Sequence, residues 1–120
     1  MPTKKAPNQI DFIEFPARDI AALERAKVFF AETFGWSYEH WGDDYVDIQG
    51  SGVGSGINAD PEHRPSQPLV VVYVQDLEET RRKVTAATGT LTRDIFSFPG
   101  GHRFHFKDPS GNEMAAWSDQ

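Results

Sequence analysis

The sequence has no cysteine among its 120 residues. This absence excludes disulfides, thiolate zinc sites and cysteine nucleophiles within the chain. Basic residues are also few, 12 against 18 acidic ones, and the formal net charge is −6. A surface that binds nucleic acid needs clustered positive charge to neutralise phosphates, so we expect no nucleic-acid partner.

Long apolar segments are missing as well. The longest apolar run, residues 69–74, is far shorter than the roughly 20 residues that a helix needs to cross a bilayer. The basic N-terminal segment, residues 1–8, is not followed by the apolar stretch of a signal peptide. We therefore expect a cytoplasmic protein with no membrane partner.

The order of the predicted elements repeats along the chain. In sequence order, the patterns predict a strand at 10–15, a helix at 19–34, strands at 36–41, 45–49 and about 53–58, then a strand at 69–74, a helix from 76 to about 89, and strands at 91–98, 102–107 and 113–117. The repetition predicts one domain, residues 9–118, made of two βαβββ modules at about 9–58 and 69–118. A proline-rich linker joins the modules, and residues 1–8 form a loose arm.

The first predicted helix carries an apolar stripe. Asp19 is a suitable N-cap, and Gly35 suits the left-handed residue that ends a helix. The residues that recur at helical spacing are Ala22, Ala26, Phe29, Phe30, Thr33 and Phe34. We expect this stripe to pack against the sheet of its module.

Five segments carry a family resemblance: Phe15-Pro16, residues 24–30, 34–36 and 74–77, and Asp-Pro-Ser-Gly-Asn at 108–112. They resemble the vicinal-oxygen-chelate superfamily, which includes glyoxalase I, the bleomycin-resistance proteins and the extradiol dioxygenases. The chain particularly resembles single-module proteins related to lactoylglutathione lyase. The resemblance implies an α+β fold in which paired βαβββ modules form a concave, mixed β-sheet cleft. It also implies a small-molecule ligand and a homodimer.

Members of this superfamily commonly hold a divalent metal on the first and last strands of the modules. The resemblance places these ligand positions at Phe12, Leu69 and Ala115, with a fourth between 54 and 58 whose register the sequence leaves open. Phenyl, isobutyl and methyl groups offer no lone pair to a metal. We therefore expect that the usual metal site has been lost and that no cofactor is held there.

Strand alternation indicates which other side chains share the face of these positions. Glu14 lies with Phe12 on the first strand, and the family's spacing back from Asp108 adds Arg103 and His105. Val71 also shares this face, and the candidate site residues on it are Phe12, Glu14, Tyr73, Arg103, His105, Glu113 and Trp117. Phe104 and Phe106 alternate to the opposite face, and we expect them to pack against helices.

Glu14 is the first candidate for a catalytic group. A carboxylate surrounded by Phe12, Tyr73 and Trp117 would be desolvated, which suits it to acid–base chemistry. The structural alternative is an ion pair between Glu14 and Arg103. Both interpretations stay open at the level of the sequence.

His105 is the second catalytic candidate, either as a proton shuttle or as a hydrogen-bond donor. Arg103 could bind a carboxylate or phosphate group of a ligand through its forked guanidinium. The alternatives are a half-exposed histidine and a solvated arginine without function. The remaining predicted substrate-binding residues are Tyr73, Trp117, Phe12 and Glu113.

Two further features have structural and functional interpretations. Trp36, His40, Trp41 and Tyr45 could form a stacking wall for a planar ligand, but core or dimer packing is the interpretation we favour. The glycine-rich segment 50–56 lacks the lysine and following helix of a phosphate-binding loop. It is better interpreted as a flexible hairpin at a cleft rim.

Three functions remain compatible with the sequence. The first is a metal-independent lyase or isomerase in which Glu14 moves a proton while His105 and Arg103 steady developing charge. The second is a non-catalytic binding or sequestration protein of the bleomycin-resistance kind, suited by its acidity to a cationic planar ligand. The third is a metal-dependent lyase or dioxygenase that uses Glu14, His105 and a donor from the glycine-rich segment.

Overall fold

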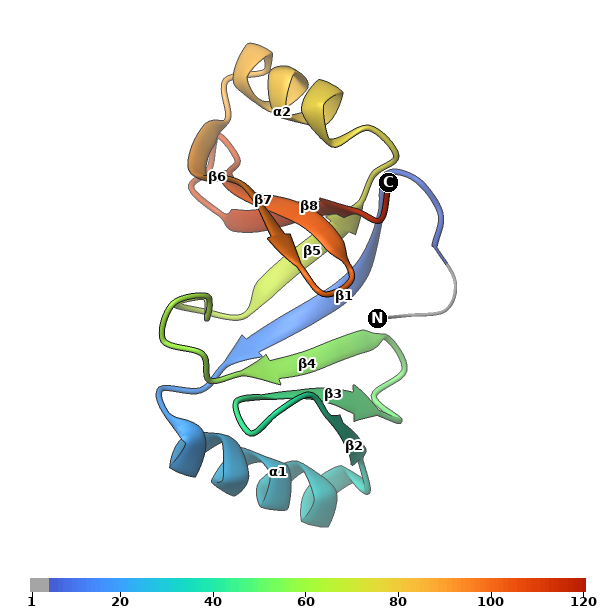
Figure 1. Ribbon diagram of the computed structural model, residues 1–120, viewed down its shortest axis with the longest axis vertical. Coiled ribbons are helices and arrows are strands. Elements are labelled where there is room, and N and C mark those ends of the chain that lie inside the picture. Colours follow the sequence, from blue (N-terminus) through green and yellow to red (C-terminus); the bar gives the residue numbers. More distant parts are fainter. Residues whose placement is uncertain (1–4) are drawn as a thin grey trace. The chain divides into compact units, whose positions relative to one another are not determined.

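The computed structural model describes residues 5–120, which form eight strands and two helices (Figure 1). Their bounds are β1 Gln9–Pro16, α1 Ile20–Phe34, β2 Ser37–His40, β3 Tyr45–Gln49, β4 Gly54–Asn58, β5 Leu69–Tyr73, α2 Leu77–Ala86, β6 Thr90–Phe98, β7 Gly101–Lys107 and β8 Glu113–Ser118. The order strand, helix, three strands occurs twice. The predicted α+β class with two βαβββ modules is therefore confirmed.

Contacts divide the described residues into two compact units. Unit 1 is residues 12–69, and unit 2 is residues 5–11 with 70–120. The division differs from the predicted module boundaries because residues 9–11 group with unit 2. The backbone N–H of Asn8 donates to the carbonyl of Tyr73 at 2.7 Å, and the Trp117 indole donates to Asp11 at 3.0 Å. These bonds join the start of β1 to unit 2.

The predicted arm, residues 1–8, is described only from Lys5 onward. Residues 1–4 of that prediction lie outside the described part of the chain. Lys5 forms an ion pair with Asp119, and Asn8 makes the backbone bond to Tyr73. The described part of the arm is thus fastened to unit 2 near the C-terminus.

The two units share one strand arrangement. In unit 1 the order is β2-β3-β4-β1, and in unit 2 it is β6-β7-β8-β5. The first and last strands of each module, β1 with β4 and β5 with β8, are parallel, while the other neighbouring strands within each module are antiparallel. Each unit therefore has a mixed sheet, and the sequence repeat is a repeat of topology.

The core of unit 1 lies between α1 and one face of its strands. Leu23 is completely buried on α1, and Val46, Ile48 and Ile57 face it from β3 and β4. Asp19 caps the helix by accepting the Ala22 N–H at 2.7 Å. Both ends of the predicted helix are confirmed, because Gly35 ends it in the left-handed conformation with φ 77°.

The predicted apolar stripe of α1 is only partly correct. Ala22, Ala26 and Phe30 pack against the core as expected. Phe29 and Phe34 are exposed by 59% and 60%. The helix carries more apolar residues than its inner face can cover, and Leu23, absent from the predicted stripe, lies at the centre of that face.

Unit 2 repeats this packing with α2 on one face of its strands. Phe104 is completely buried, and Val74, Leu77 and Ala116 surround it. Phe106 joins them at the edge, so Phe104 and Phe106 face the helix as predicted. The helix begins after its N-cap Asp76 and ends at Ala86, before the predicted end near 89. Within residues 5–120, neither helix has the length and apolarity needed to span a membrane.

Candidate functional site

Glu14 lies in unit 1 on the sheet face opposite α1. In the parallel pair of β1 and β4, Phe12 lies opposite Gly54 and Glu14 lies opposite Gly56. In the next pair, Gly56 lies opposite Asp47 of β3, and Asn58 lies opposite Tyr45. Directly opposed residues point to the same face of a sheet. This register brings Glu14, Tyr45, Asp47 and Asn58 onto one face.

Two neutral donors hold the Glu14 carboxylate. The Tyr45 hydroxyl donates to Oε1 at 3.0 Å, and the Asn58 side-chain amide donates to Oε2 at 3.3 Å. Glu14 is 1% exposed and Asn58 is 4% exposed. A buried carboxylate needs such hydrogen bonds, because burial without them is costly. Each oxygen is therefore fixed in position by a different strand.

Glycine at position 56 makes room for the Tyr45–Glu14 bond. A Cβ atom on Gly56 would lie 2.8 Å from the Tyr45 hydroxyl, 2.8 Å from the Val46 carbonyl and 3.1 Å from the Phe12 ring. The tyrosine side chain therefore crosses the strand over the missing side chain. Phe12, 2% exposed, packs against the same gap.

Replacing Gly56 with alanine is expected to destabilise the protein by about 1–3 kcal/mol, the usual range for forcing an atom into a packed site. The backbone carbonyl of Val46 cannot move as a side-chain tip can, so Tyr45 must shift away from Glu14. Chemical denaturation measures the loss. Gly52→Ala is the comparison. A Cβ atom on Gly52 would meet nothing within 4 Å, so any loss of stability there comes from its φ of 92° and not from a steric clash. A harmless Gly56→Ala would contradict the described crossing.

The aromatic residues at 36–45 do not form one cluster. Trp36 packs on Phe30 in the core, with ring centroids 5.0 Å apart. Trp41 is 55% exposed, and its indole N–H donates to Asp47 at 3.0 Å. Tyr45 contacts Glu14. The core interpretation is right for Trp36, while Trp41 and Tyr45 belong to the Glu14 face.

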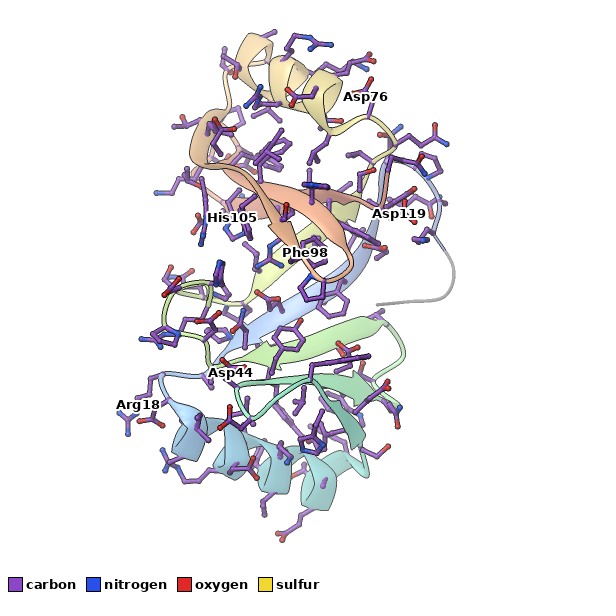
Figure 2. The ribbon with its side chains drawn as sticks, in the orientation of Figure 1. Arg18, Asp44, Asp76, Phe98, His105 and Asp119 are labelled. Atoms are coloured by element: carbon purple, nitrogen blue, oxygen red, sulfur yellow. The ribbon has the colours of Figure 1, made fainter. Side chains whose placement is uncertain are left out.

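In unit 2, Arg103 and His105 lie on the face opposite α2, as alternation predicts. They pair with Trp117 and Ala115 on β8 and are 6% and 5% exposed. Figure 2 labels His105 on β7 and Phe98 at the end of β6. The ring of Phe96 lies 5.6 Å from that of His105 and 5.4 Å from the Arg103 guanidinium carbon. Both polar side chains are thus packed among aromatic rings and are not solvated.

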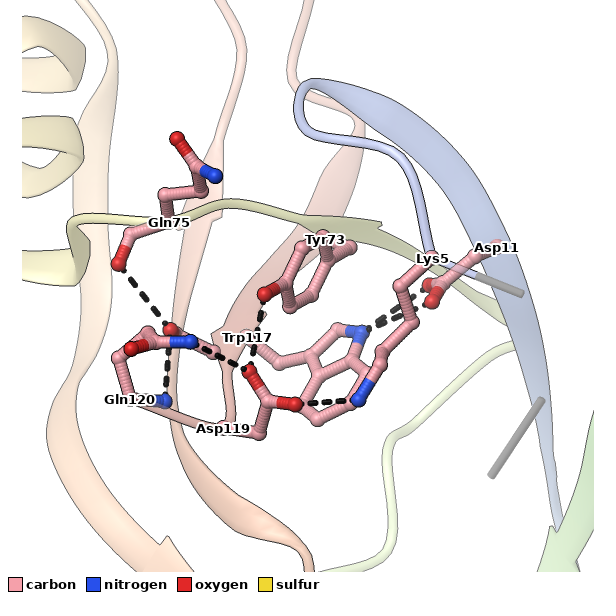
Figure 3. A network of polar contacts seen from close by, with 8 residues as sticks. Lys5, Asp11, Tyr73, Gln75, Trp117, Asp119 and Gln120 are labelled. Carbon is pink, nitrogen blue, oxygen red and sulfur yellow. Dashed lines mark hydrogen bonds and ion pairs between the residues drawn. The ribbon is translucent and has the colours of Figure 1, made fainter. Parts of the chain in front are cut away.

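Tyr73 and Trp117 form an aromatic pair in unit 2. Their ring centroids lie 5.1 Å apart in an edge-to-face arrangement. The Trp117 indole donates to Asp11, and the Tyr73 hydroxyl donates to Asp119 at 2.9 Å (Figure 3). The ammonium group of Lys5 pairs with Asp119 and lies 5.6 Å from the Trp117 ring centroid. Tyr73, Trp117, Asp11 and Asp119 are together called the cation cage below.

Asp119 should titrate unusually low. Hydrogen bonds from the Lys5 ammonium and the Tyr73 hydroxyl lower its pKa from 3.8 to about 2. A lowered carboxyl pKa contributes stability that is complete above pH 3.8 and is lost as the pH falls through about 2. The bond to Asp119 also raises the pKa of Lys5 above 10.5.

We therefore expect the Lys5–Asp119 contact to persist from about pH 4 to pH 10 and to open only in stronger acid or base. An NMR titration of the Asp119 carboxyl carbon measures this directly. In Lys5→Ala the Asp119 midpoint should rise toward 3.8, because the bond from Lys5 is the largest of the causes that lower this pKa. A midpoint near 3.8 in the wild-type protein would contradict the described contact.

Glu113 was predicted to bind substrate, but its described contact is structural. It is half-buried, and its carboxylate accepts a hydrogen bond from the Thr92 hydroxyl at 2.9 Å. It also lies opposite Lys107 at the start of β8. The contact joins β8 to β6 at the edge of unit 2, and a ligand role for Glu113 stays a prediction.

A pocket of about 550 Å³ lies on the α2 side of unit 2 and includes His102, Asp76 and Ser118. Its polar groups have structural tasks. Asp76 caps α2 by accepting the Glu79 N–H at 3.0 Å, and the Ser118 hydroxyl donates to the Gln75 carbonyl at 3.3 Å. We therefore assign no chemistry to this pocket.

The residues at the three positions where the vicinal-oxygen-chelate superfamily carries metal ligands cannot coordinate a divalent ion. Phe12, Leu69 and Ala115 are apolar and at most 2% exposed. The register now places Gly54 and Gly56 on the Glu14 face of β4, where the sequence left the fourth position open. Within residues 5–120, no three His, Asp or Glu side chains are grouped as metal ligands.

The sequence interpretation missed Tyr45, Asn58 and Asp47 as neighbours of Glu14. The hairpin turn at 42–44 was found, but the β3–β4 register that brings these residues beside β1 was not. Side-chain alternation along β4 puts Asn58 and Gly56 on one face, and pairing β4 with β3 across the hairpin would have added Tyr45 and Asp47 to that face. The contacts of Lys5 and Asp11 join residues more than 100 positions apart and had no local signal.

Comparison with known proteins agrees with this architecture. Residues 9–115 match the sequence profile of the Glyoxalase/Bleomycin resistance protein/Dioxygenase superfamily. No curated protein sequence matches the chain.

Solved structures share the fold at low identity. A superfamily member from Vibrio splendidus 12B01 has a TM-score of 0.64 at 17% identity, covering 89% of this chain and 96% of that one. Methylmalonyl-CoA epimerase from Mycobacterium tuberculosis has a TM-score of 0.62 at 13% identity, covering 98% and 92%. The Mn(II)-bound glyoxalase from Novosphingobium aromaticivorans has a TM-score of 0.65 at 16% identity, covering 97% of this chain and 40% of that one. The chain belongs to the Glyoxalase/Bleomycin resistance protein/Dioxygenase superfamily.

Proposed function

We propose that this protein is a small-molecule enzyme, a lyase or isomerase, in which Glu14 transfers a proton. The observation that carries the proposal is the buried carboxylate of Glu14, held by Tyr45 and Asn58 on the sheet face opposite α1. A fixed, desolvated carboxylate is suited to remove a proton from a carbon next to a carbonyl group. The substrate class is a small carbonyl or hydroxy-acid compound.

The proton balance of the proposed step is simple. The Glu14 carboxylate takes the proton from the carbon, and the electron pair of the broken C–H bond passes to the carbonyl oxygen of the substrate. Glu14 can return the proton to a neighbouring atom, which gives an isomer. An epimer forms when water donates a proton to the other face of the carbon, and Glu14 then loses its proton to solvent. Tyr45 and Asn58 keep the carboxylate in one orientation throughout.

The sequence also predicts a role for His105 and Arg103, which lie in unit 2. Their predicted role is to steady negative charge that develops on the substrate. Their burial on one face among Phe96 and neighbouring rings supports a defined orientation for both side chains. This role stays a prediction, as do the homodimer and the cytoplasmic location.

Hydrogen–deuterium exchange tests the proposal without knowledge of the full reaction. Methylmalonyl-CoA, small hydroxy ketones and 2-oxo acids are incubated with the protein in D₂O, and loss of the C–H signal is followed by ¹H NMR. The proposal expects catalysed exchange of at least one compound, with and without a chelator. Exchange that a chelator abolishes and one divalent ion restores would favour the alternative of unusual metal ligands.

A second candidate function is ligand binding without chemistry. The exposed Trp41 indole beside Asp47, on the same sheet face as Glu14, favours it, because an aromatic and acidic surface suits a planar cation. Such a protein would bind a dye cation stoichiometrically, lose affinity in Trp41→Ala and catalyse no exchange.

A further inference from the structure

The cation cage of unit 2 already holds a positive charge supplied by its own chain. The Lys5 ammonium pairs with the Asp119 carboxylate and lies 5.8 Å from the Tyr73 ring centroid and 5.6 Å from that of Trp117. Figure 3 shows the lysine side chain running along the Trp117 indole. A cation against two aromatic rings and a carboxylate is how proteins recognise organic ammonium groups.

The cage is built without help from the lysine. The Tyr73 hydroxyl bonds to Asp119 at 2.9 Å, and the Trp117 indole bonds to Asp11 at 3.0 Å, so each ring is anchored to one carboxylate. Tyr73 and Trp117 are 6% and 1% exposed and pack edge to face. Removing the Lys5 side chain therefore leaves both rings and both carboxylates in place.

The two carboxylates, Asp11 and Asp119, make the cage electrostatically favourable for a cation. Burial raises the pKa of Asp11, although its bond to Trp117 acts in the opposite direction. Asp119 is ionised over the physiological range, since its pKa is about 2. A nearby cation stabilises the charged form of both groups. The chain as a whole carries a net charge of −6.

The Lys5 side chain is partly exposed to solvent, so a ligand can displace it from the cage. This side chain is 32% exposed, and the described residues before β1 are fastened to unit 2 through Lys5 itself and the Asn8 backbone. A short covalent tether gives the lysine an effective concentration of roughly millimolar order, which a free ligand at higher concentration can overcome. An exposed ion pair of this kind is also weak.

We propose that the cage formed by Tyr73, Trp117, Asp11 and Asp119 is a binding site for a primary alkylammonium group, and that Lys5 occupies it as a displaceable stand-in. This goes beyond the proposed function, which rests on Glu14 in unit 1. A ligand of this class donates an N–H to Asp119 and lays its methylenes on the indole. The Lys5 side chain leaves the cage when the ligand enters.

The test uses the full chain and n-butylammonium chloride, which has the length and charge of the lysine side chain. The indole N–H signal of Trp117 is followed by ¹⁵N NMR and is assigned by its absence in Trp117→Phe. Titrations are made with wild type, Lys5→Ala and Lys27→Ala, and sodium chloride is the control for ionic strength. Lys27 is the matched control, because it also lies 5.8 Å from an aromatic centroid, that of Tyr38.

Lys5→Ala should bind n-butylammonium about tenfold more tightly than wild type or Lys27→Ala, because the tethered competitor is gone. Adding Asp119→Asn to Lys5→Ala should weaken this binding about tenfold. Tetramethylammonium, which has no N–H to donate, should bind less tightly than n-butylammonium.

The proposal is overturned if Lys5→Ala shows no saturable Trp117 shift while its spectrum remains that of the folded protein. It is also overturned if wild type, Lys5→Ala and Lys27→Ala bind with equal affinity. Should Lys5→Ala fail to fold, Lys5→Gln removes the same charge with less loss of packing and is judged by the same outcomes.

Discussion

Glu14→Gln is expected to lower turnover by about 10²–10⁴-fold while ligand affinity changes little, the range that general acid–base groups contribute. Glutamine keeps the shape of the side chain, and its amide oxygen can still accept the Tyr45 hydroxyl. It cannot accept a proton from the substrate. The measurement is kcat and KM for the compound that shows the fastest exchange with wild type.

Glu32→Gln is the matched control for this change. Glu32 is exposed on α1, so the same chemical substitution there should leave both kinetic constants unaltered. Tyr45→Phe should give a smaller decrease than Glu14→Gln, because it removes one hydrogen bond to the carboxylate and keeps the carboxylate itself. If Glu14→Gln lowers stability but retains turnover, the carboxylate is structural and the proton is moved by another group.

Leu23→Ala is expected to lower the free energy of unfolding by about 2–5 kcal/mol, the range for removing a buried leucine side chain. Leu23 is 0% exposed at the centre of the unit 1 core. Phe29→Ala on the same helix should cost less than about 1 kcal/mol, because 59% of Phe29 is exposed. Urea unfolding of the three proteins compares the midpoints.

A cost for Phe29→Ala as large as that for Leu23→Ala would contradict the described orientation of α1. A cost for Phe29→Ala that grows with protein concentration would instead show that Phe29 is covered by a second copy of the chain. The comparison therefore separates the fold of one chain from the homodimer that the sequence predicts.

The fold was predictable because its signals are local. The cap at Asp19, the left-handed Gly35 and the glycines of the turns each mark an element boundary within a few residues. The exact inner face of α1 was not predictable in the same way. A helix whose apolar residues cover much of its circumference does not indicate which of them face the core. Leu23 faces the core because it packs against Val46, Ile48 and Ile57 of β3 and β4.

The candidate site was predictable only along single strands. Alternation placed Glu14 with Phe12 on β1, and put His105 and Arg103 on the same side of β7. The partners of Glu14 depend on register between strands, which no local pattern supplies. Tyr45 and Asn58 therefore emerged from the structure, as did the contact of Lys5 with Asp119.

The central claim is that Glu14 moves a proton, and the most direct measurement is solvent exchange in D₂O with wild type, Glu14→Gln and Glu32→Gln side by side. The proposed function predicts catalysed loss of the substrate C–H signal with wild type and Glu32→Gln, and a rate lower by about 10²–10⁴-fold with Glu14→Gln. Equal exchange rates for all three proteins would contradict it.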